Sequence, residues 1–216
     1  MTDAKIGVEM RAARIRMSET TSLTGINFFV AAGVHAITGA NGSGKSTLLR
    51  RMAAVDVNGV DALRWDGADV LVLTVPERAM LRAAILSEAR PVVDYTCLEF
   101  VAIAVPDKSS RQRLARAQDM LQSLGIARLA EQSVRTVSAG EWAWIRLAQA
   151  AVTMPNVLFV DEIDAAVSEA DRLRLYAVLR ETARTVVAVS HDMAGVTMWA
   201  DSVWELSGGQ LHFVNR

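Results

Sequence analysis

A glycine-rich segment carries the clearest chemistry in the sequence. Gly39-Ala40-Asn41-Gly42-Ser43-Gly44-Lys45-Ser46 matches the pattern G-x-x-x-x-G-K-[ST] of a phosphate-binding P-loop. Its backbone N–H groups can turn toward a phosphate, and the N-terminus of a following helix adds positive charge. We expect the Lys45 ammonium to reach the β- and γ-phosphates of a nucleotide and the Ser46 hydroxyl to bind Mg²⁺. The predicted nucleotide-binding residues here are Gly39, Asn41, Gly42, Ser43, Gly44, Lys45, Ser46 and Thr47.

Two acidic residues follow a second apolar segment. Residues 157–160 read Val-Leu-Phe-Val, which is typical of a buried strand, and Asp161 and Glu162 come next. Ligands of open α/β sheets bind at the carboxyl ends of the strands. Asp161 is therefore a predicted Mg²⁺ ligand, and Glu162 a predicted general base for the attacking water. Taken alone, the pair also fits a helix N-cap, an alternative that the P-loop disfavours.

A histidine stands in a comparable position after a third segment. His191 and the preceding Ser190 follow residues 185–189, a run of Thr, Val and Ala that predicts another buried strand. A neutral imidazole there can hydrogen-bond a γ-phosphate or the attacking water. A purely structural histidine is the alternative. The predicted catalytic residues are thus Glu162, His191 and Lys45.

The elements that hold these residues predict an α/β fold of one domain spanning residues 1–216. Short valine-rich runs predict strands at residues 34–38, 70–75, 157–160 and 185–189. Helical periodicity is found at residues 46–55, 111–124 and 142–151. Residues 77–154 contain no convincing strand and are interpreted as a mostly helical sub-domain. The expected class is a P-loop NTPase with a mostly parallel central sheet.

Composition limits the range of partners. The formal net charge is −1, which gives no electrostatic reason to expect nucleic acid. Cys97 is the single cysteine, so no internal disulfide is possible and a reducing, cytoplasmic setting is expected. No apolar run is long enough to predict a transmembrane helix. Any membrane association is therefore expected to come through a partner.

In their order and spacing, the motifs resemble the nucleotide-binding subunit of an ABC transporter. The resemblance rests on residues 23–26 (LTGI), the P-loop, residues 157–162 (VLFVDE) and Ser190-His191. It implies N-terminal β elements, ATP and Mg²⁺ as cofactors, and ATP hydrolysis coupled to transport. It also implies a transmembrane permease, a second ATPase subunit in a homodimer or heterodimer, and a position at the cytoplasmic face of the membrane. Asp164 falls in the loop that crosses the dimer interface in this family.

The family signature, usually LSGGQ, has two candidates in this chain. Residues 206–210 spell LSGGQ but lie after His191, with too few residues beyond them for a helix, so we predict a hairpin turn there. Residues 137–141 (VSAGE) stand at the family position before a predicted helix, where Ser138 and Gly140 are expected to contact the γ-phosphate. Ala139 and Glu141 depart from the family pattern, which predicts weaker closure of the dimer.

Three further assignments come from the resemblance alone. Glu77 matches a family glutamine that contacts Mg²⁺ or water, and a solvated turn acid is the alternative. Residues 96–100 match a stretch near the permease, where exposed apolar side chains are expected. The usual aromatic residue that stacks on adenine is missing, so this role falls to another residue such as Met17 or Arg16, or base stacking is weak.

Two other classes of function stay open from the sequence. A soluble ABC-type ATPase without a transporter has the same motifs, because a fold does not fix the partner. A nucleotide-dependent switch with little turnover is suggested by Ala139, Glu141 and Glu77. The transported substrate and the direction of transport are not encoded in these motifs.

Overall fold

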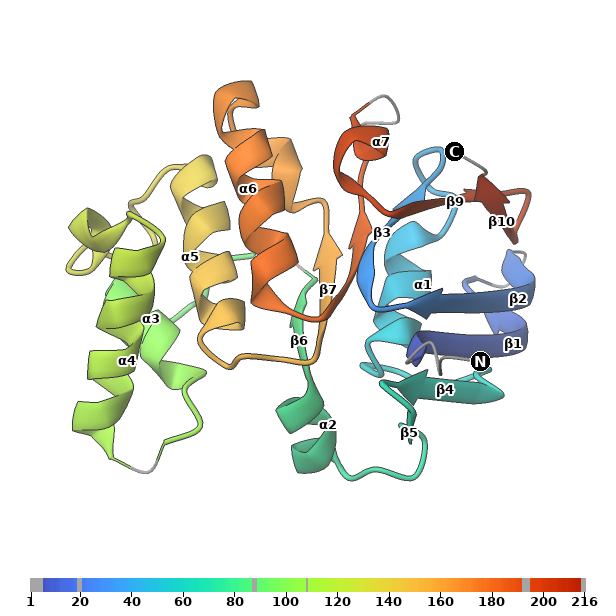
Figure 1. The fold of residues 1–216 in the computed structure, drawn as a ribbon, viewed down its shortest axis with the longest axis horizontal. Coiled ribbons are helices and arrows are strands. Elements are labelled where there is room, and N and C mark those ends of the chain that lie inside the picture. Colours follow the sequence, from blue (N-terminus) through green and yellow to red (C-terminus); the bar gives the residue numbers. More distant parts are fainter. Residues whose placement is uncertain (1–5, 19–20, 87–88, 108, 192–194, 215–216) are drawn as a thin grey trace.

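A six-stranded sheet forms the centre of the molecule (Figure 1). The computed structural model describes residues 6–18, 21–86, 89–107, 109–191 and 195–214. The strand order is β10-β9-β3-β8-β7-β6, and only the β9–β10 pair is antiparallel. The strands are β3 (Gly33–Thr38), β6 (Arg82–Ile85), β7 (Val157–Asp161), β8 (Thr185–Val189), β9 (Ser202–Ser207) and β10 (Gln210–Val214). The predicted α/β class with a mostly parallel sheet is confirmed.

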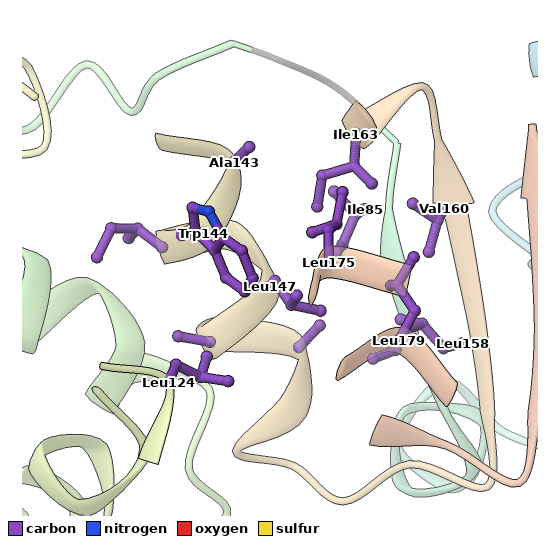
Figure 2. Close-up of a cluster of buried hydrophobic side chains, with 14 of the residues drawn as sticks. Ile85, Leu124, Ala143, Trp144, Leu147, Leu158, Val160, Ile163, Leu175 and Leu179 are labelled. Atoms are coloured by element: carbon purple, nitrogen blue, oxygen red, sulfur yellow. The ribbon is translucent and has the colours of Figure 1, made fainter. Parts of the chain in front are cut away.

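Alternate residues of the central strands pack into two cores. In β7, Leu158 and Val160 face the helices α5 (Ala139–Ala151) and α6 (Glu169–Thr182), as Figure 2 shows. Val157 and Phe159 belong to a second core on the other face, with residues of α1 (Lys45–Met52). This alternation follows from the two-residue period of a strand. Because both faces are covered, the central strands are almost uniformly apolar.

An antiparallel sheet covers α1 from the side opposite the central sheet (Figure 1). Its strands are β1 (Ile6–Arg16), β2 (Ser22–Ala31), β4 (Ala62–Trp65) and β5 (Ala68–Asp69), in the order β2-β1-β4-β5. Phe28 and Trp65 pack in the same core as Leu48 and Leu49 of α1. The indole of Trp65 also donates a 2.9 Å hydrogen bond to the Met52 carbonyl at the end of α1. The helix that follows the P-loop is thus held on both sides.

The remaining helices gather on the other side of the central sheet. They are α3 (Cys97–Ile103), α4 (Ser110–Ser123) and η1 (Ala127–Leu129), followed by α5, η2 (Ile163–Ala166), α6 and α7 (Val196–Trp199). The predicted helices at residues 111–124 and 142–151 correspond to α4 and α5 and are confirmed. Among the described residues, no helix combines the length and hydrophobicity needed to cross a membrane.

The prediction of a strand at residues 70–75 is wrong. Val70 is buried but Val72 is exposed, and Val75 begins the helix α2 (Val75–Leu81). Thr74 and Glu77 form a capping box at the start of this helix. The strand that enters the central sheet is β6, which lies within residues 77–154, where no strand was expected. Between β6 and β7, the described residues form helices and no named strand.

The LSGGQ sequence forms a hairpin turn, as predicted. Ser207 ends β9 and Gln210 begins β10, with Gly208 and Gly209 between them at φ 56° and 76°. Two consecutive residues with positive φ are typical of the tight turns that join antiparallel strands. This stretch begins no helix and therefore lacks the geometry of a signature motif.

Candidate nucleotide site

The P-loop joins β3 to α1, as the sequence predicts. Gly39 and Gly44 have φ of 141° and 104°, which side-chain-bearing residues rarely adopt. Gly44 is also the N-cap of α1 and supplies no side chain to the first N–H groups of the helix. These donors remain available for an anion. The loop is thus a phosphate cradle built from backbone groups.

Lys45 is held at the loop by backbone carbonyl groups. Its ammonium donates hydrogen bonds to the carbonyl oxygens of Gly39 and Ala40, at 2.9 and 3.0 Å. Only 4% of the residue is exposed. Burial lowers the pKa of the ammonium, and the charges of Glu162 and Asp161 act in the opposite direction. The lysine therefore places a desolvated positive charge at the point where phosphates would bind.

Asp161 ends β7 beside the P-loop helix. Its carboxylate is hydrogen-bonded to the side chain of Ser46. Burial raises the pKa of this carboxyl group, and the bond with Ser46 opposes the rise. Among the described residues, the buried Oδ1 atom of Asp161 has no hydrogen-bond partner. A buried, unpartnered carboxylate oxygen is destabilising unless something binds it.

These features fit a magnesium ion. Mg²⁺ in nucleotide sites usually takes one or two protein oxygens and completes its shell with water and phosphate. Ser46 and Asp161 provide two such oxygens in contact with each other. No cluster of three or more His, Cys, Asp or Glu residues able to hold a metal occurs in the described ranges. Ser46 and Asp161 offer a partial shell, which suits a metal that arrives with a nucleotide.

Glu162 and His191 meet at the ends of two neighbouring strands. The Nε2 atom of His191 lies 2.5 Å from Oε1 of Glu162, and both side chains are partly exposed. Glu162 has a left-handed backbone, with φ 49° and ψ 36°, which is uncommon outside glycine. Its N–H donates to the Val189 carbonyl at the end of β8. This left-handed turn therefore places the Glu162 carboxylate next to the His191 ring.

A cavity of about 400 Å³ brings most of the predicted residues together. Met17 forms part of its wall, at the position where the resemblance leaves the adenine contact to Met17 or Arg16. A Cβ atom on Gly44 would lie 2.7 Å from the Met17 sulfur, so this side chain packs directly on the P-loop. The lining residues are Met17, Asn41, Gly42, Gly44, Lys45, Ser46, Thr47, Glu162 and His191.

Ser138 and Gly140 lie outside this cavity, at the start of α5. Ser138 is the N-cap, and its hydroxyl accepts a hydrogen bond from the Glu141 N–H. The Glu141 carboxylate in turn accepts hydrogen bonds from the N–H and hydroxyl of Ser138, at 3.0 and 2.9 Å, and pairs with Arg128 at 2.7 Å. The bonds from Ser138 and Arg128 lower the pKa of Glu141. The Glu141 carboxylate therefore occupies the N–H and hydroxyl donors of Ser138 within the same chain.

The methyl group of Ala139 does not strain this motif. An added methyl group would crowd a phosphate here only if position 139 required a positive φ. Ala139 is the first helical residue of α5 and is not among the residues with positive φ. Of the two departures from the family pattern, Glu141 is the one with a structural consequence.

Glu77 does not join the site. Its assignment assumed that a strand ends just before it, whereas the structure places it in α2, ahead of β6. Its carboxylate accepts hydrogen bonds from the hydroxyl and N–H of Thr74, both at 2.7 Å. These two bonds lower its pKa. Glu77 is a helix-capping residue at the solvent surface, which corresponds to the alternative considered for it.

The hydrogen bond between Ser190 and Asp164 was not predicted from the sequence. Asp164 was assigned to an interface loop, yet it is only 7% exposed and accepts a hydrogen bond from the Ser190 hydroxyl. The available signal was the position of Ser190 directly before a predicted catalytic histidine.

A P-loop, an acid pair and a histidine at one edge of a parallel sheet define a P-loop nucleoside triphosphatase. Comparison with known proteins gives the family. The sequence model described as ABC transporter matches residues 23–165. The chain is 31% identical to the hemin import ATP-binding protein HmuV of Jannaschia sp. over 208 residues, which cover 91% of this chain and 77% of the relative.

The names of other similar proteins give different transported substrates. Identity is 32% to the aliphatic sulfonates import ATP-binding protein SsuB of Granulibacter bethesdensis, covering 94% of this chain and 81% of the relative. Identity is 29% to the vitamin B12 import ATP-binding protein BtuD of Vibrio atlanticus, covering 81% and 75%. The solved structure of cbiO1 from Clostridium perfringens superposes with a TM-score of 0.81 at 20% identity, covering 96% and 87%. This last likeness supports the fold.

The chain belongs to the ABC transporter family and is an ATP-binding subunit of it. Such subunits are ATPases that power transport through membrane permeases. Among the alternatives that the sequence left open, nothing in the comparisons favours a soluble ATPase outside transport.

Proposed function

We propose that Lys45, Ser46, Asp161, Glu162 and His191 carry out Mg²⁺-dependent ATP hydrolysis in this subunit. The observation that supports this most directly is their convergence on one edge of the sheet, beside the P-loop. Lys45 and the loop N–H groups bind and neutralise the phosphates. Ser46 and Asp161 hold Mg²⁺, which when bound neutralises charge on the phosphate oxygens.

Glu162 and His191 act on the attacking water. The Glu162 carboxylate accepts its proton as general base, and the adjacent imidazole donates its N–H to Glu162 and orients it. The Met17 side chain packs against the adenine. Because a thioether offers less contact than an aromatic ring, the phosphate contacts dominate nucleotide affinity in this proposal.

The Glu162→Gln variant tests this assignment. It should bind MgATP with little change in affinity, while kcat falls by about 10²- to 10⁴-fold because the amide cannot accept the proton. Glu181→Gln, an exposed change on α6, is the control and should keep full activity. Equally slow hydrolysis by the wild type and the Glu162→Gln variant would instead favour a nucleotide-dependent switch with little turnover.

A second ATPase subunit completes the site in this proposal. Ser138 and Gly140 at the start of α5 contact the γ-phosphate bound to the P-loop of the other subunit. Dimer closure around ATP and reopening after hydrolysis then move the permease. The Glu141 carboxylate disfavours such contact between two copies of this chain, so we propose a different subunit as the partner.

The permease is proposed to dock against a groove beside β6. The groove has a volume of about 380 Å³, and its walls include Arg82 of β6, Phe100 of α3, and Trp142 and Arg146 of α5. Apolar and cationic walls together fit a permease segment that combines apolar and acidic side chains. In this proposal the subunit lies at the cytoplasmic face of the membrane.

Transport is proposed to run inward, because the relatives described above are all named import proteins. Their named cargoes differ at similar identity, so the cargo is left to the permease and its binding protein. Reconstitution of the purified complex in liposomes tests the direction. ATP-driven movement toward the compartment that contains this subunit is expected, and movement away from it would overturn the proposal.

A further inference from the structure

Asp164 is a buried carboxylate with no role in the mechanism proposed above. It lies in η2, two residues after Glu162, and is 7% exposed. Its Oδ2 atom accepts two hydrogen bonds, from the hydroxyl of Ser190 at 2.8 Å and from the phenol of Tyr176 at 2.9 Å. A buried carboxylate is costly unless it is well hydrogen-bonded. The bonds therefore constrain the three residues strongly.

The two donors come from different parts of the fold. Ser190 lies between β8 and His191, whereas Tyr176 lies in the middle of α6 and stacks on Trp199 with 4.4 Å between ring centroids. Asp164 thus links the turn that carries Glu162 to the segment that carries His191. The Tyr176 bond connects the same carboxylate oxygen to α6, which carries none of the residues proposed as catalytic.

Backbone hydrogen bonds fix the strand ends from which the two segments leave. Glu162 donates its N–H to the Val189 carbonyl, and Ser190 donates its N–H to the Ile37 carbonyl in β3. These backbone bonds set the strand ends. Past these ends, the Asp164–Ser190 bond joins the two segments by a side-chain contact next to the Glu162–His191 contact.

We propose that Asp164 is a positioning residue that, through Ser190, holds His191 against Glu162. The proposal rests on the catalytic roles assigned to Glu162 and His191. In it the Asp164–Ser190 bond maintains the 2.5 Å contact between His191 Nε2 and Glu162 Oε1. A displacement of about 1 Å in a catalytic group can cost up to about 100-fold in rate, so this bond affects turnover rather than nucleotide binding.

Two matched variants separate positioning from stability. Ser190→Ala and Tyr176→Phe each remove one hydroxyl from the same carboxylate oxygen, and the two bonds have nearly equal length. Both variants should lower Tm by similar amounts. Ser190→Ala should reduce kcat by about tenfold with KM for ATP within twofold, whereas Tyr176→Phe should leave kcat within about twofold of wild type.

A second measurement asks whether Ser190 acts through the histidine. If it does, Ser190→Ala should cause no further loss of kcat in a His191→Ala background. The Asp164→Asn variant, whose amide oxygen still accepts both hydroxyls, should retain most activity, and Asp164→Ala should fall to the level of Ser190→Ala or below.

Two kinds of result would contradict different parts of the proposal. Equal kcat for Ser190→Ala and Tyr176→Phe, or an undiminished effect of Ser190→Ala without His191, would overturn the positioning role while leaving the ATPase assignment intact. Wild-type turnover by Glu162→Gln would instead contradict the catalytic role assigned to Glu162, whatever Ser190 does.

Discussion

At the scale of single residues, Asp161 links magnesium affinity to pH. Burial raises the pKa of its carboxyl above the ordinary value of about 3.9 for aspartic acid. Mg²⁺ binds the ionised form, so protons compete with the metal as the pH falls. We expect the Mg²⁺ concentration for half-maximal ATPase activity to rise on acidification, by up to about tenfold per unit below this pKa.

The control for this prediction is Asp161→Asn, which has no proton to exchange. ATP itself also binds protons, so the wild type and the variant share that part of the pH dependence. A steeper increase in the wild type, measured by Mg²⁺ titration at several pH values, supports the assignment. Parallel curves for the two proteins would exclude Asp161 as the titrating ligand.

Glu141 is a second residue whose charge is expected to limit activity. Its carboxylate occupies the Ser138 donors, and its lowered pKa keeps it ionised in mildly acidic solution. Glu141→Gln keeps the shape of the capping box but removes the negative charge from the neighbourhood of a γ-phosphate. We expect kcat/KM to rise by about two- to tenfold in ATPase assays.

A matched control exists because Glu77 caps α2 in the same way. Glu77→Gln removes a carboxylate from a Thr74 capping box with comparable bonds, at a place apart from the nucleotide cavity. Its kinetics and Mg²⁺ dependence should match the wild type. A rise in activity for both variants would point to a general effect of charge, and a change in Mg²⁺ dependence with Glu77→Gln would restore its role as a ligand.

At the scale of elements, the two candidate signatures predict opposite effects. Gly209 has φ 76°, and a Cβ atom there would lie 2.8 Å from the Ser22 carbonyl oxygen, so Gly209→Ala should lower the free energy of unfolding by about 1 to 3 kcal/mol. Thermal unfolding should show a lower Tm while kcat of the folded protein is retained. Ser138→Ala should instead reduce kcat, and the reverse pattern would make LSGGQ the working motif.

Some of the strands could be predicted from the sequence and one could not. The P-loop, β7 and β8 were predictable because buried parallel strands are nearly all apolar and their carboxyl ends carry the polar residues. β6 was missed because its four residues begin with Arg82 and contain no valine. The valine-rich residues 70–75 resembled a strand more closely than β6 does. Thr74, Pro76 and Glu77, however, form a pattern that is typical of the start of a helix.

The parts of the site that depend on tertiary contact could not be predicted. The bond between Asp164 and Ser190 joins residues 26 positions apart, and the contact of His191 with Glu162 spans 29. Both follow from the register of β7 against β8, which pairs Asp161 with Val189. A single sequence indicates that these strands exist, but their adjacency requires the fold.

At the scale of the whole molecule, we expect the charge at the proposed signature, residues 137–141, to affect how subunits pair. In a head-to-tail homodimer, each of two Glu141 carboxylates would face a γ-phosphate, and like charges at an interface weaken association. We therefore expect Glu162→Gln to remain monomeric with MgATP in size-exclusion chromatography. The double variant Glu141→Gln/Glu162→Gln should associate at least about tenfold more tightly, because its signature is neutral. Glu77→Gln/Glu162→Gln is the matched control and should stay monomeric. Strong dimerisation of Glu162→Gln alone would show that this chain closes with its own copy despite Glu141.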